Sequence, residues 1–167
     1  YQSLNPKEAL SIPCFSMAKG FDNDFSSFDP EFEKVVEIYN AWGSSECSEK
    51  EGNPRPIKGE GKKSISETEK GSIQKALREN YRFGFVAGGL DDRGVYQELY
   101  ENEQTQYSPG LTAVLAKDQT KEGILNALNA KSCYATTGVR IILGLSIAGF
   151  PMGSELSSKV KPGLVFN

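Results

Sequence analysis

The sequence contains no histidine among its 167 residues, and this absence limits the metal chemistry open to it. Histidine supplies the commonest neutral ligand for zinc, iron and manganese, so only carboxylates, carbonyls and thiolates remain. The three cysteines, Cys14, Cys47 and Cys133, are an odd number without close spacing. They therefore indicate neither a disulfide framework nor a CxxC zinc or redox site, and we expect reduced thiols.

Long apolar runs and long runs of like charge are also missing. The longest apolar stretch, residues 141–150, is interrupted by glycines and a serine and is shorter than the ~20 residues of a membrane-spanning helix. Lys and Arg together number 19 against 22 Asp and Glu, and no block of one sign is long enough to attract a polyanion. We therefore expect neither a membrane nor a nucleic acid as a partner, while the compartment is left open.

Alternating strand-like and helix-like patterns predict an α/β fold. Short apolar runs typical of strands cover four segments, residues 11–17, 34–39, 83–87 and 111–116. Two helices are also expected, because Ser72 and Thr120 can each cap a segment whose apolar residues recur at i, i+3 and i+4. This order predicts right-handed crossovers onto a mostly parallel sheet. Residues 43–71, rich in glycine, proline, serine and charge, are expected to form a long irregular loop.

The C-terminal part follows a different pattern. From Val139 to Ile147 apolar residues alternate with period two, which predicts a half-buried antiparallel strand. A turn at residues 149–153 and a further extended segment are expected to follow. We therefore divide the chain into an α/β domain over residues 1–138 and the start of a C-terminal β segment over residues 139–167.

Two groups of polar residues are candidates for a site. Asp91 and Asp92 follow a predicted strand, where α/β folds place ligands, although adjacent aspartates in a turn are more often solvated caps. Thr136, Thr137 and Arg140 combine hydroxyls with a cation and would suit an anionic ligand. Loop hydroxyls that only cap turns are the more frequent alternative.

Other motifs argue against common kinds of catalysis. Residues 144–149 miss the GxSxG spacing by one residue, and without a histidine base a serine hydrolase is rejected. Residues 59–64 lack the spacing of a phosphate-binding loop. Cys14 ends a predicted buried strand, and a buried thiol is usually an inert hydrophobe rather than a nucleophile.

Several motifs carry a resemblance when they are taken together. In chain order they include Ile12-Pro13-Cys14-Phe15, Val36-Glu37-Ile38-Tyr39-Asn40, Gly88-Gly89-Leu90-Asp91-Asp92-Arg93 and Cys133-Tyr134-Ala135-Thr136-Thr137-Gly138. Over residues 10–156 the chain resembles the C-terminal half of a bacterial family related to the PHP (polymerase and histidinol phosphatase) domain. The resemblance implies a partial, distorted β/α barrel of mostly parallel strands, with a short antiparallel β segment at the C-terminus. It also implies an enzyme that uses divalent metal ions to hydrolyse phosphate esters, and it implies that this chain is a fragment.

The chain departs from the metal motifs of that family. Where the family has two histidines after Ile-Pro, this chain has Cys14 and Phe15, and where the family has Gly-Ser-Asp-x-His, only Asp91 survives and Arg93 replaces the histidine. The resemblance thus makes Cys14, Asp91 and Arg93 the positions of a vestigial metal site, in which the cation of Arg93 opposes a metal. We expect no metal, no cofactor and no catalytic residue in this chain.

Three hypotheses of function follow. The first is a degenerate or partial PHP-like phosphoesterase domain without hydrolytic activity. The alternative is a non-catalytic anion-binding or assembly module, in which Arg93, Thr136, Thr137 and Arg140 hold a small anion in the cleft at the barrel end. A third, an active enzyme, would hold another metal with carboxylates and Cys14. Because half a barrel leaves an unpaired strand edge, we also expect a homo-oligomer, in the simplest case a symmetric dimer.

Overall fold

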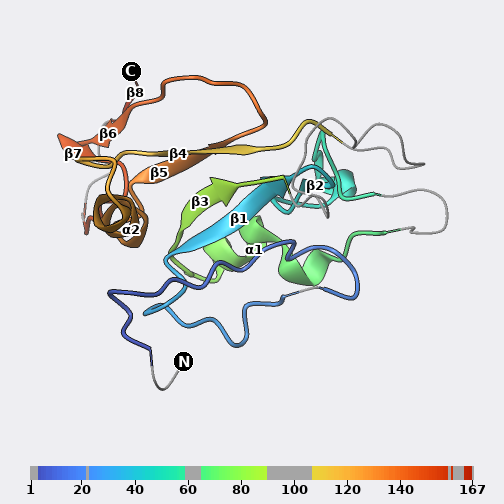
Figure 1. Cartoon of the computed structure of the whole chain (residues 1–167). Helices are drawn as coiled ribbons and strands as arrows, with labels where there is room; N and C mark the ends of the chain where they lie inside the picture. Colours follow the sequence, from blue (N-terminus) through green and yellow to red (C-terminus); the bar gives the residue numbers. More distant parts are fainter. Residues whose placement is uncertain are drawn as a thin grey trace.

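A computed structural model describes residues 4–21, 23–58, 65–89, 107–157, 159 and 164–166 of the chain. In these residues three small sheets form (Figure 1). The first has the order β2-β1-β3 and contains β1 (Val35–Asn40), β2 (Gly43–Ser44) and β3 (Gly84–Ala87). The second pairs β4 (Leu111–Val114) with β5 (Cys133–Thr136). The third has the order β7-β6-β8 and contains β6 (Leu145–Ile147), β7 (Phe150–Pro151) and β8 (Leu164–Phe166).

The predicted fold class is wrong, because the described residues form mixed and antiparallel sheets and close no barrel. Strands β1 and β3 pair in parallel, and the other pairs are antiparallel. The expected second crossover fails at α2 (Lys121–Asn129), which joins β4 to β5. After this helix Lys131 adopts a left-handed conformation (φ 57°), which helps to turn the chain back along β4. The helix also buries little apolar surface, since Ile124 is 41% exposed.

Both predicted helix starts are confirmed. The Ser72 hydroxyl accepts a hydrogen bond from the Lys75 N–H at 3.3 Å and caps α1 (Ile73–Arg78). The Thr120 hydroxyl caps α2 in the same way, accepting from the Gly123 N–H at 3.0 Å. Each cap satisfies one of the N–H groups that the first turn of a helix leaves unpaired. No helix of the described residues is long and apolar enough to cross a membrane.

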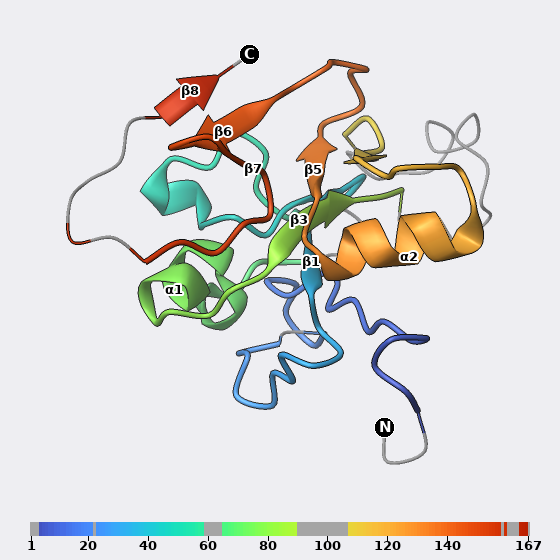
Figure 2. The ribbon, with the colours of Figure 1, turned by 90° about the vertical axis from the view of Figure 1, so that its left-hand side faces the viewer.

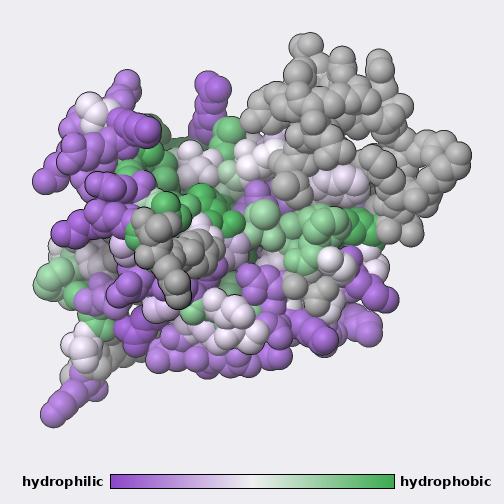
Figure 3. Space-filling view, turned by 60° about the horizontal axis from the view of Figure 1, so that its bottom comes forward, coloured by the Kyte–Doolittle hydropathy of each residue, from purple (hydrophilic) through white to green (hydrophobic). Residues whose placement is uncertain are grey.

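The main core lies between α1 and the first sheet. Phe25 and Phe83 stack there with ring centroids 5.7 Å apart, and Val36 and Ile73 pack in the same cluster. Figures 1 and 2 show α1 on one side of the β1–β3 pair and the β4–β5 sheet on the other. On the face seen in Figure 3 the margins are hydrophilic and hydrophobic residues gather in a band between them. The first sheet is therefore covered on both faces.

The predicted strand over residues 11–17 does not form, although part of this segment is buried. Ser16, Met17 and Ala18 are each 0% exposed. The Ser16 hydroxyl donates to the Gly71 carbonyl at 2.8 Å, and the Met17 carbonyl accepts from the Thr68 N–H at 2.7 Å. These bonds hold residues 16–18 against residues 68–71 as an irregular layer. The layer forms no ladder with a described strand.

In its described residues, 43–58 and 65–71, the predicted loop is largely irregular, apart from β2 and the short 3-10 helices η1 (Glu49–Glu51) and η3 (Glu69–Gly71). The strand predicted from Val139 to Ile147 forms only at its end, as β6. Its antiparallel pairing is confirmed. Residues 139–144 join no sheet of the described structure. Val139 and Ile141, which belong to the predicted apolar face, are 62% and 51% exposed, so no described element covers this part of the face.

Candidate functional site

A small cavity lies between the carboxyl ends of β1 and β5. Its volume is ≈ 210 Å³. The lining residues come from β1, β5, β2 and the loop after β2, and include Ile38, Tyr39, Ser44, Glu46, Asn53, Arg55, Thr136 and Thr137. Segments far apart in the sequence thus meet at one place. Strand ends are where many folds gather their ligand-binding groups.

Hydrogen bonds of the loop after β2 place Arg55 at this cavity. The Asn53 side-chain amide donates to the carbonyls of Ser44 (3.0 Å) and Cys47 (2.7 Å). Its oxygen accepts from the Arg55 N–H at 3.0 Å, and the Arg55 carbonyl accepts from the Ser44 N–H at 2.7 Å. Gly43 permits the close approach of this loop, since a Cβ there would lie 2.7 Å from the Pro56 carbonyl oxygen. The backbone of Arg55 is therefore held from both sides.

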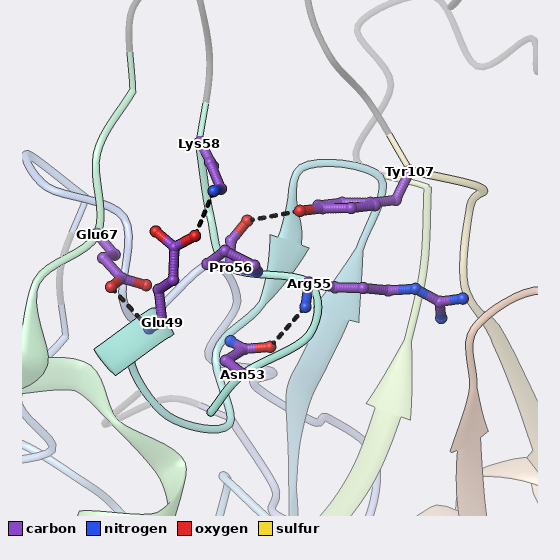
Figure 4. A network of polar contacts seen from close by, with 7 residues as sticks. All are labelled: Glu49, Asn53, Arg55, Pro56, Lys58, Glu67 and Tyr107. Carbon is purple, nitrogen blue, oxygen red and sulfur yellow. Dashed lines mark hydrogen bonds and ion pairs between the residues drawn. The ribbon is translucent and has the colours of Figure 1, made fainter. Parts of the chain in front are cut away.

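The guanidinium of Arg55 has an aromatic neighbour but no acidic one among the residues described. Its central carbon lies 5.7 Å from the centroid of the Tyr39 ring, within the range of a cation–π contact. The ion pairs of the described residues involve other cations. In Figure 4 the Arg55 side chain extends away from Glu49 and Glu67, which belong to a separate polar network with Lys58. In the described part of the chain, the partly buried Arg55 thus has no carboxylate partner.

Tyr39 and Thr136 are two hydroxyl-bearing residues of the same cavity wall. The Tyr39 hydroxyl donates to the Ser108 carbonyl at 2.7 Å. Burial raises the pKa of the Tyr39 phenol, and the charge of Arg55 acts against this rise. Thr136 Oγ1 is buried and has no hydrogen-bond partner in the described part of the protein. A buried hydroxyl without a partner costs ~1–3 kcal/mol, so it is a group that a bound ligand could satisfy.

A second polar cluster surrounds the buried carboxylate of Glu37, 9% exposed on β1. Its Oε2 accepts from the Asn40 amide at 2.9 Å, and the Phe15 N–H donates to the same carboxylate. Burial raises the pKa of Glu37. A Cβ at Gly88 would lie 3.1 Å from Glu37 Oε1, so the glycine leaves room for the carboxylate. No ion pair of the described residues includes this group.

Cys14 lies near this carboxylate and is exposed, which corrects its predicted burial. The protein packed against its thiol and, to a lesser degree, the negative charge of Glu37 raise the pKa of Cys14. A raised pKa disfavours the thiolate, which is the form that attacks or binds metal. Within the described ranges no group of three or more His, Cys, Asp or Glu could hold a metal ion.

The predicted site residues have different outcomes. Asp91 and Arg93 lie outside the described residues. Thr136 and Thr137 both line the cavity, whereas Arg140 is exposed and does not belong to its lining. Among the described lining residues the cation is Arg55, which sequence reasoning missed because it lies in a loop interpreted only as irregular.

Glu37 was missed as a site residue as well. Its signal was present in the sequence, since it is a single charged residue inside the apolar run of β1. A charged side chain in such a position is almost never fully buried unless it has partners. That signal could have directed attention to the polar cluster at this strand.

Comparison with known proteins assigns the chain to a family. A family model described as "Protein of unknown function (DUF3604)" matches residues 58–161, which is more than half of the chain. The chain belongs to the DUF3604 family. Uncharacterized proteins of Chlamydia trachomatis serovar D and Chlamydia muridarum are each 54% identical to it over 168 residues, and one of Chlamydia pneumoniae is 52% identical over 167 residues. Each of these bacterial relatives is matched over 100% of this chain and 26% of its own length, so the chain spans about a quarter of them.

No solved structure matches this DUF3604 chain. The proposed resemblance to the PHP-related family is wrong, because the family that matches is DUF3604, its function is unknown, and the relatives are uncharacterized proteins. The motifs that carried the resemblance are short. Part of one, residues 133–136, forms an antiparallel strand instead of a barrel strand.

Proposed function

We propose that this region of the DUF3604 family is a non-catalytic binding module that holds a small anion in the cavity between β1 and β5. The observation that carries the proposal is Arg55, a partly buried residue at the cavity whose guanidinium has no carboxylate partner among the described residues. Charges removed from water are normally paired, and guanidinium groups bind carboxylates and phosphates with two parallel hydrogen bonds. An anionic ligand would supply the missing partner.

Two hydroxyls support this proposal. Thr136 and Thr137 line the same cavity, and Thr136 Oγ1 has no protein partner within the described ranges. The Thr136 oxygen is covered in the structure, so it reaches a ligand after rotation about χ1, which moves the side chain between staggered positions. After this rotation the Thr136 hydroxyl would donate a hydrogen bond to the anion, and its oxygen would no longer be buried without a partner.

We infer binding rather than hydrolysis from the groups around the cavity. Hydrolysis needs a nucleophile next to a base, or a metal that activates water. Among the described residues no hydroxyl of the cavity is hydrogen-bonded to a lysine or carboxylate side chain. The Ser44 hydroxyl accepts from the Glu46 backbone N–H at 3.1 Å, and the Tyr39 hydroxyl donates to a carbonyl. The absence of turnover and of a bound metal stays a prediction.

Anion binding is tested by thermal unfolding with acetate, phosphate and sulfate at constant ionic strength. We expect at least one of these anions to raise the unfolding temperature in a saturable way, and Arg55→Gln to abolish the effect. The matched control is Arg78→Gln, which removes the same charge from the surface of α1, where Arg78 contacts Gln74. Equal responses of the two variants, or no saturable response of the wild type, would refute the proposal.

Assembly is a second candidate function, favoured by exposed apolar residues near the C-terminal sheet. Val139, Ile141, Ile142 and Phe150 are 62%, 51%, 100% and 53% exposed. The sequence predicted a dimer from the open strand edge of a half barrel. This reason no longer holds, because the described residues form no barrel. The exposed residues supply another reason, because apolar residues gathered at a surface mark interaction sites. We propose that a second copy of the chain covers them in a symmetric dimer.

A further inference from the structure

The charge at the cavity limits the kind of anion that fits. Among the described residues that line the cavity there is one cation, Arg55, and one exposed carboxylate, Glu46. Arg55 can balance one negative charge of a ligand. A second negative charge on the ligand would be repelled by the Glu46 carboxylate. A monoanion leaves the smaller electrostatic penalty.

The available hydrogen-bond donors narrow the choice further. Sites for phosphate commonly use several free backbone N–H groups from a nest or a helix N-terminus. Here the Ser44 and Arg55 N–H groups are bonded to the Arg55 carbonyl and to Asn53, and the Glu46 N–H is bonded to the Ser44 hydroxyl. Among the described lining residues, the guanidinium fork and the hydroxyls of Ser44, Thr136 and Thr137 keep hydrogens for a ligand, since Ser44 only accepts in its bond with Glu46. This set satisfies the two oxygens of a carboxylate better than the four of a phosphate.

The size and lining of the cavity describe the rest of the ligand. A volume of ≈ 210 Å³ is below the ~300–1,000 Å³ of ordinary small-molecule pockets, so the ligand is small. The wall also includes Ile38, Pro54 and Ala135, which offer no side-chain hydrogen bond. A short apolar body would fill this part.

We infer that the cavity binds a small monocarboxylate, with its carboxylate on Arg55 and Thr136 and a short aliphatic body beside Ile38. This inference rests on the proposed anion-binding function and names the ligand class of the same site. A longer aliphatic body should bind more tightly until the cavity is full. The gain should be roughly fourfold in affinity for each added CH₂.

The test compares acetate, propionate and butyrate with inorganic phosphate and sulfate by calorimetric titration at constant ionic strength. We expect affinity to rise from acetate to butyrate, and butyrate to bind about tenfold or more tightly than phosphate. Arg55→Lys keeps the charge but loses the fork, so it should weaken butyrate binding about tenfold. Thr136→Val should weaken it to a similar degree, since it removes a hydrogen bond to a charged group.

The outcomes separate this inference from the proposal on which it rests. Arg55-dependent binding that is tighter for phosphate or sulfate than for any carboxylate would overturn the monocarboxylate and leave the anion-binding function standing. Equal affinity for all three carboxylates would also overturn the inference, because it would show that no apolar wall is used. Binding of none of the five anions would overturn both.

Discussion

The replacement Thr136→Val isolates the buried hydroxyl at the cavity. Valine keeps the shape of threonine and removes an oxygen that has no partner in the described structure. Since an unsatisfied buried hydroxyl costs ~1–3 kcal/mol, the free energy of unfolding of the ligand-free protein should rise by about 1 kcal/mol. Valine also has a high propensity for β-strands, so we expect β5 to remain intact. For a chain of this size the gain corresponds to about 2–4 °C in unfolding temperature.

Thr112→Val on the neighbouring strand β4 makes the same chemical change with the opposite expected sign. The Thr112 hydroxyl donates to the Ala87 carbonyl at 2.8 Å and accepts from the Ala87 N–H at 2.9 Å. Its loss leaves two backbone groups without partners and should lower the free energy of unfolding by about 2 kcal/mol or more. Equilibrium urea unfolding of both variants measures the difference. Destabilisation of Thr136→Val as large as that of Thr112→Val would refute the reasoning, since it would show that the Thr136 hydroxyl is satisfied.

Three further predictions concern pH, packing and assembly. Because burial raises the pKa of Glu37 above its usual 4.5, its ionisation destabilises the fold progressively as the pH rises from about 4.5 through the folded pKa. In urea unfolding, the free energy of unfolding of Glu37→Gln should therefore increase relative to that of the wild type over this pH range. A difference between the two free energies that does not change with pH would contradict the prediction. Gly71→Ala should unfold the protein or destabilise it by several kcal/mol, because the new Cβ would lie 1.8 Å from the Ser16 carbonyl oxygen. Gly149→Ala has no atom within 4 Å of the new Cβ and should cost only the ~1–2 kcal/mol of a left-handed backbone. Similar urea midpoints for the two variants would contradict this difference. Ile142→Asp should convert the expected dimer to a monomer in sedimentation velocity, and a wild type that sediments as a monomer at micromolar concentration would exclude the dimer.

Local signals in the sequence predicted α1, α2 and the strands β1, β3 and β4, whereas β2 and β5 were missed. The caps at Ser72 and Thr120 act on N–H groups three residues away, so the information lies within one turn of chain. The pairing of the strands could not be predicted in this way. An apolar run has the same pattern whether its partner runs parallel or antiparallel, and the reversal after α2 depends on the left-handed Lys131, a residue type that carries no such signal.

The candidate site was predicted only in part, for the same reason. Thr136 and Thr137 stand together in the sequence and were recognised as possible anion contacts. Arg55 joins them through the hydrogen bonds of Asn53 and the close approach at Gly43, which depend on the folded loop. Glu37 could have been found earlier, because its charge interrupts an otherwise apolar strand.

The irregular N-terminal layer has a consequence for synthesis of the chain. Residues 16–18 are fully buried, and they are held by residues 66–71, about fifty positions later. While the chain emerges from the ribosome, Met17 must remain exposed to water or to chaperones until that later segment has appeared. The loop between them can then close, at an entropic cost that grows only slowly with its length. Assembly of this layer is therefore expected to follow translation of α1 rather than to precede it.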